Sequence, residues 1–195
     1  MGRSAESHAM DWHYWSGSIM VGLIVFRLIW GVIGGSTARF TSFVRSPGSA
    51  FAYLRSDAAR APGHNPLGAY SVIAMLALLV VQVGTGLFAG DTDGLESGPL
   101  SYLVSFDQTQ TAAEIHETSF NLLLALVGLH ILAVLYYTVV RKHGLIRAMI
   151  TGRDAGVDPG NGALVPAPLW KLALAVTVAA ALAFWITKGA PFSAS

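Results

Sequence analysis

The sequence predicts an all-α protein, a transmembrane helical bundle of four spans, and three observations lead to this fold class. The chain of 195 residues is 53% hydrophobic and only 12% charged, whereas an ordinary soluble domain is about 25% charged. Its mean hydropathy is +0.55. Four apolar stretches are long enough, or nearly so, to cross the ~30 Å hydrocarbon core of a bilayer. No alternating pattern typical of strands competes with them, so we expect residues 1–195 to form a single integral membrane domain surrounded by lipid.

The helix limits follow from start and stop signals. Pro66 and Pro168 stand where the second and fourth helices should begin, since proline is favoured in the first turn. Thr111 and Glu114 match a capping box for the third helix. Glycines close the spans, Gly90 among them. The predicted spans are residues 14–34, 67–90, 115–140 and 169–187.

Charges in the connections predict the orientation. Residues 36–66 and residues 141–168 are rich in arginine and lysine, whereas the connection between the second and third spans contains acids and no basic residue. The positive-inside rule therefore places both basic connections in the cytoplasm and the acidic one, with both termini, outside. This is the arrangement expected of a multi-pass protein of the inner membrane. A short outward N-terminus without a signal peptide is what we expect if an earlier helix has been lost.

Two histidines on the third span are the main functional signal. His116 and His130 are separated by fourteen positions, which is about 21 Å along a helix and within about 40° of one face. Polar groups inside a bilayer need partners. Two core histidines bonded to carbonyls would be the structural alternative, but the spacing favours ligands to haem iron. The chain has no cysteine, which excludes covalent attachment of haem and any iron–sulfur cluster.

His13 opens the first span on the same side of the membrane as His116, so the two can meet across the bundle and bind one iron axially. Such bis-histidine ligation favours electron transfer over oxygen chemistry. A shared zinc ion fits less well, because His116 and His130 are too far apart and no carboxylate or thiolate converges on them.

Three further positions are candidates for the cofactor sites. Gly17, one turn after His13, leaves room for a porphyrin face or serves close helix packing. Arg27 should contact a haem propionate or extend to the cytoplasmic interface. His64 could contact a propionate, line a quinone site, or lie in a capped surface loop. The polar residues within the spans should form hydrogen bonds between helices: Gln82, Thr85 and Asn121.

Several motifs together resemble the prokaryotic cytochrome b561 family, which includes the cytochrome b subunit of nickel–iron hydrogenases. They occur in the family's order over most of the chain to about Gly152. The matching stretches are HYWSG from His13, FRLIWG from Phe26, ARFTSF from Ala38, GHNPLG from Gly63, TGLF from Thr85, EIHE from Glu114, His130, and MITG from Met149.

The resemblance implies a four-helix core that binds two b-type haems, with His13 matching the ligand of the family's second helix and His116 and His130 the pair of its fourth. This chain would then consist of core helices two to four plus a C-terminal helix. The family's first helix and its histidine are not found here, so His130 has no evident partner in the sequence, and one or two haems are expected.

The resemblance also implies a function: an electron-transfer protein or oxidoreductase subunit that carries electrons between a redox partner and quinone or another carrier. The partner would be a c-type cytochrome, or a subunit of a dehydrogenase or hydrogenase. In a dehydrogenase or hydrogenase complex this chain would be the membrane anchor. A homodimer is a further expectation, and the net charge of +1 gives no reason to expect nucleic acid. A non-redox membrane scaffold with structural histidines is the alternative from another class.

Overall fold

The computed structural model describes residues 5–44, 46, 48, 66–93, 96–142 and 165–188. Within these ranges the chain is helical, and the only extended pairing is an isolated bridge between Gly90 and Ser97. The predicted all-α class is therefore confirmed. The elements are α1 (Ala5–Ile33), α2 (Phe40–Phe43), α4 (Pro66–Gly86), the 3₁₀ turn η1 (Ser101–Leu103), α5 (Phe106–Val139) and α7 (Leu169–Thr187).

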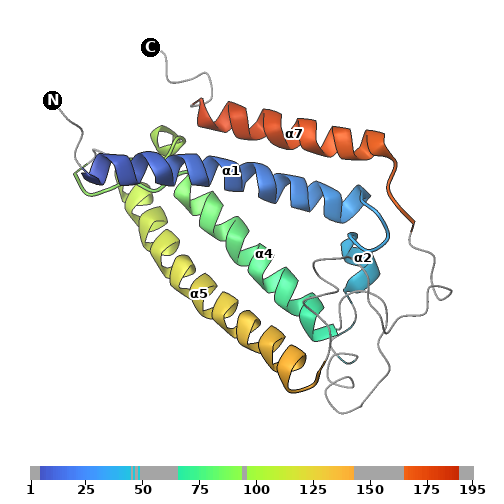
Figure 1. The fold of residues 1–195 in the computed structure, drawn as a ribbon. Helices are drawn as coiled ribbons and strands as arrows, with labels where there is room; N and C mark the ends of the chain where they lie inside the picture. The colour runs from blue at the N-terminus through green and yellow to red at the C-terminus, as the bar shows by residue number, and fades with distance from the viewer. Residues whose placement is uncertain are drawn as a thin grey trace.

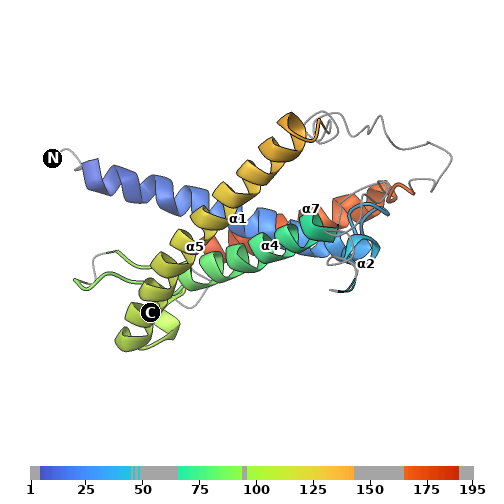
Figure 2. The same cartoon turned by 90° about the horizontal axis from the view of Figure 1, so that it is seen from below.

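The four long helices are arranged as two antiparallel pairs (Figure 1). One pair is α1 with α7, and the other is α4 with α5, with α1 also contacting α4. In the view of Figure 1, α4 ends near the N-terminal half of α1 and diverges from its C-terminal half, and α5 packs on α4. Seen from below, α5 crosses α1 at a large angle (Figure 2). The first half of α1 is therefore where the two pairs come together.

All four long helices are apolar and long enough to span a membrane, so the chain is a multi-pass membrane protein. The candidate spans are Ala9–Ile33, Gly68–Gly86, Phe106–Val139 and Leu169–Thr187. In the most apolar window of α5, 0% of the residues are buried within the protein. Exposed apolar side chains on this scale are stable only where lipid replaces water.

Three helix limits differ from the sequence prediction. The first helix begins at Ala5, well before the predicted start at residue 14. The third span does not begin with a capping box at Thr111. Its helix starts at Phe106, where Ser105 accepts a hydrogen bond from the backbone of Gln108 and the Gln108 side chain accepts one from the backbone of Ser105. The second helix ends at Gly86 rather than Gly90, because the chain turns there toward the bridge described above. Pro66, in contrast, is the first residue of α4, as predicted.

Small residues allow α7 to lie against α1. A Cβ atom on Gly22 would be 3.4 Å from the Cβ of Ala183 and 3.9 Å from the carbonyl oxygen of Ala179. Ala175 and Ala179 are buried in this contact region. Close approach of backbones through small side chains is the usual way in which membrane helices associate.

The two ends of the bundle differ in the connections that they carry. The start of α1, the end of α7 and the connection from α4 to α5 lie at one end (Figure 1). At that end, the Tyr14 hydroxyl donates to the Glu96 carboxylate at 2.9 Å. At the other end, Ser36 and Val165 exchange two hydrogen bonds of 3.0 Å, which join the chain after α1 to the chain before α7. The two basic connections therefore leave the same end of the bundle.

Candidate functional site

His13 and His116 approach each other where α1, α4 and α5 converge. Their ring centroids are 5.9 Å apart and the ring planes make an angle of 87°. An imidazole nitrogen binds a metal at about 2 Å, so two imidazoles on opposite sides of one ion have centroids on the order of 6 Å apart. The separation therefore suits a shared iron, although direct edge-to-face packing of two rings gives a similar distance.

The His116 ring rests on the C-terminal end of α4. Its Nδ1 atom is 2.8 Å from the backbone carbonyl oxygen of Gln82 and its Nε2 atom is 3.0 Å from the Gln82 side-chain nitrogen. The Gln82 side-chain oxygen in turn accepts a hydrogen bond from the Ser119 hydroxyl. A Cβ atom at Gly86 would be only 2.8 Å from Cε1 of His116. The ring therefore occupies space that only glycine at position 86 leaves open.

His130 is held by the same helix, nearer its N-terminus. Its Nδ1 atom lies 3.1 Å from the Ser71 hydroxyl. The side chain is half-buried, and a Cβ atom at neighbouring Gly128 would meet nothing within 4 Å. The structure brings no second histidine to His130 among the described residues, so it does not form a pair comparable to His13 and His116.

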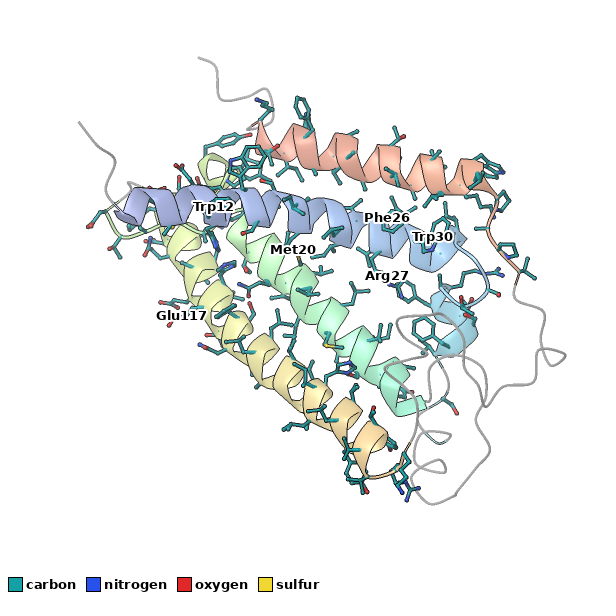
Figure 3. All side chains as sticks on the ribbon, in the orientation of Figure 1. Trp12, Met20, Phe26, Arg27, Trp30 and Glu117 are labelled. Atoms are coloured by element: carbon teal, nitrogen blue, oxygen red, sulfur yellow. The ribbon has the colours of Figure 1, made fainter. Side chains whose placement is uncertain are left out.

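Arg27 faces the short helix α2 (Figure 3). Its guanidinium donates to the carbonyl oxygen of Ala38 at 3.3 Å and lies 4.8 Å from the centre of the Phe40 ring. The ring edge of Phe40 packs on Gly31, where a side chain would collide with it. The positive charge of Arg27 thus has a carbonyl oxygen and an aromatic ring as partners. Both lie at the end of α1 from which the basic connection of residues 36–66 leaves.

The remaining candidates are placed as follows. A Cβ atom at Gly17 would meet nothing within 4 Å, so the surface of α1 beside His13 is open. His64 lies outside the described residues. Gln82 and Thr85 lie between helices, with the Thr85 hydroxyl 3.4 Å from Nδ1 of His116, whereas Asn121 is exposed and makes no hydrogen bond within the described part of the chain.

Acidic side chains at the α4–α5 connection fall into two groups. Asp91 and Glu96 are half-buried and hold the connection in place: the backbone nitrogen of Glu96 donates to Asp91 at 3.2 Å, and Glu96 accepts from Tyr14. The others are exposed to the surroundings, and Glu117 points away from the bundle (Figure 3). These exposed acids are Asp93, Asp107, Glu114 and Glu117.

Sequence reasoning did not anticipate that Ser71, Gly86 and Ser119 support the histidines. Single serines and glycines are common in membrane helices, and their positions along α4 and α5 give no signal without the register of the two helices. Gln82 was recognised as a polar residue between helices, but not as a neighbour of both nitrogens of His116.

Four membrane-spanning helices with two histidines meeting from different helices define a polytopic membrane protein with a candidate metal or haem site. Residues 1–152 match the family model of prokaryotic cytochrome b561. Because the match covers most of the chain, the protein belongs to this family of membrane b-type cytochromes, which act in electron transfer. The comparisons with curated proteins and with solved structures found no significant match.

Proposed function

We propose that this chain is a cytochrome of the inner membrane that carries electrons between a redox partner and quinone or another carrier, using b-type haem held by histidines. The observation that carries the proposal is the 5.9 Å separation of the His13 and His116 rings. Two imidazoles from facing helices, with an open glycine surface at Gly17 beside them, have the donor chemistry that axial ligation of haem requires.

In this proposal His13 and His116 would hold the haem iron at the acidic end of the bundle. When bound, haem supplies reversible one-electron oxidation and reduction. Two imidazole ligands would keep small molecules from the iron and so favour electron transfer. The apolar side chains of the helices around the site provide a medium of low dielectric constant, which raises the energetic effect of every nearby charge.

His130 is proposed as a ligand at a second site, toward the basic end. Arg27 and His64 are proposed as contacts to haem propionates or to quinone there. For Arg27 this requires the guanidinium to contact an anion while it stays near Ala38 and Phe40. Such a contact is reasonable because a guanidinium has five donors, and one bond to a carbonyl leaves several of them available.

The first experiment is a haem count per polypeptide by pyridine haemochrome, with a reduced-minus-oxidised spectrum of the purified protein. We expect b-type haem with the spectrum of a six-coordinate low-spin iron. Two haems would support sites at both His116 and His130, and one would support the His13 and His116 site alone. Absence of haem after growth with ample haem supply would overturn the electron-carrier proposal in favour of structural histidines.

The acidic end of the bundle is proposed to bind a basic soluble partner such as a c-type cytochrome. Changing Asp93, Asp107 and Glu114 to neutral amides should slow electron exchange with such a partner about tenfold at low ionic strength and reduce its salt dependence. Stopped-flow kinetics over a series of salt concentrations would measure this effect. Asp91 and Glu96 are left unchanged, because they hold the connection in place.

The matched control replaces Asp154 and Asp158, in the connection predicted to lie across the membrane, by asparagine. These changes should leave the rate and its salt dependence unaltered. If the variant with three neutralised acids behaves like the control, the acidic end is not the docking surface.

A further inference from the structure

Both histidines of α5 turn Nδ1 to α4, and His116 also contacts this helix through Nε2. Nδ1 of His116 lies 2.8 Å from the Gln82 carbonyl oxygen, and Nδ1 of His130 lies 3.1 Å from the Ser71 hydroxyl oxygen. The two contacts are far apart along both helices and follow the antiparallel register of the pair. One helix therefore orients both rings in the same way.

At His116 the partner determines the tautomer. A backbone carbonyl oxygen can only accept a hydrogen bond, so Nδ1 must be the protonated nitrogen and donate to Gln82. Nε2 then carries the lone pair and is the ring nitrogen able to bind a metal. The Ser119 hydroxyl fixes the Gln82 carboxamide beside it, so the ring is held at both nitrogens.

At His130 the same orientation depends on one side chain. The Ser71 hydroxyl is the hydrogen-bond partner that the structure gives to this histidine, and Nε2 has none within the described residues. A hydroxyl can accept from Nδ1–H, and Nε2 is then the ring nitrogen that carries the lone pair. Metal-binding histidines are usually held in this way, with the second ring nitrogen donating to a fixed oxygen.

Packing alone does not require this arrangement. A histidine that only satisfied its own polarity in lipid would gain as much by bonding through Nε2 as through Nδ1. Both rings turn Nδ1 to the same helix, but only at His130 is Nε2 without a partner among the described residues, because Nε2 of His116 lies 3.0 Å from the Gln82 side-chain nitrogen. The Nε2 atom that His130 leaves unbonded among the described residues is the observation that points to ligation.

We propose that Ser71 is a positioning residue for His130: it holds the Nδ1-protonated tautomer and so assigns Nε2 as the atom that binds haem iron, as the Gln82 carbonyl does for His116. This inference rests on the proposed haem function and deepens it. Ser71 would therefore support the second haem site from α4 without contacting the iron itself.

The test compares the whole protein carrying Ser71→Ala with wild type and with Ser71→Thr, which restores a hydroxyl. Haem affinity at one site should fall about 10- to 100-fold in Ser71→Ala. The midpoint potential of the remaining haem at that site should rise, because an imidazole without a hydrogen-bond acceptor at Nδ1 donates less charge to ferric iron. Ser71→Thr should recover both values. Redox titration and electron paramagnetic resonance of the ferric form follow the two haems separately.

Ser18→Ala is the matched control, since its hydroxyl donates to its own helix at the Tyr14 carbonyl. The inference is overturned if Ser71→Ala equals wild type, if its effect falls on the haem lost in His116→Ala, or if Ser71→Thr does not restore the signal. It is also overturned if wild type holds a single haem that disappears in His116→Ala, an outcome that leaves the proposed function standing. A protein without any haem would instead overturn the proposed function itself.

Discussion

Replacing His116 with alanine is expected to remove the haem at the acidic end of the bundle while the protein still inserts into the membrane. Loss of a residue that merely supports a ligand already costs 10- to 100-fold in affinity, so loss of the ligand itself should exceed about 100-fold. The haem count should fall by one per polypeptide. The matching signal should vanish from the reduced-minus-oxidised spectrum, and His13→Ala should remove the same signal because the two rings face each other at 5.9 Å.

His143→Ala is the control for this experiment, because His143 follows α5, beyond its end at Val139. It should keep the wild-type haem count and spectrum. If His116→Ala also kept them, the edge-to-face contact of His13 and His116 would be simple ring packing, and the ligands would have to be sought elsewhere. Membrane fractionation of each variant separates loss of haem from loss of the protein.

Much of the fold could be predicted from the sequence because the bilayer imposes strong constraints. The length of the apolar stretches, Pro66 at the start of α4 and the separation of basic from acidic connections all depend on the one-dimensional pattern of residues. Helix limits were less accurate. Ser105 and Gln108 form the cap of α5, but a later polar sequence beginning at Thr111 fits the same rule, and the sequence cannot rank them.

The sequence singled out the histidines of the candidate site but not the residues that contact them. His13, His116 and His130 stand out because imidazoles are costly in lipid without partners. Ser71 and Gly86 are ordinary residues whose role comes only from the register of α4 against α5. Arg27 shows the reverse: its charge marked it as important, but its contact with the Ala38 carbonyl depends on how the chain turns back after α1.

Two glycines of α4, Gly84 and Gly86, allow a direct test of whether the contact between this helix and the His116 ring matters for haem binding. Gly86→Ala would bring a methyl group to 2.8 Å from Cε1 and 3.0 Å from Nδ1 of His116, whereas Gly84→Ala would meet nothing within 4 Å. Both changes raise helix propensity by up to about 1 kcal/mol. Any difference between them therefore reports the contact with the ring and not the backbone of α4.

We expect Gly84→Ala to bind haem like wild type, and to be as stable or slightly more stable to heat. In Gly86→Ala the ring must move away from the Gln82 carbonyl, which is its acceptor at 2.8 Å. Haem affinity at that site should then fall about 10- to 100-fold, as it does when the outer partner of a ligating histidine is lost. Haem titration of the two proteins, with the low-spin ferric signal as a second readout, measures the difference. Equal affinity in both variants would mean that the His116 ring can bind iron without its contacts to α4. The end of α4 would then serve only the fold and not the haem site.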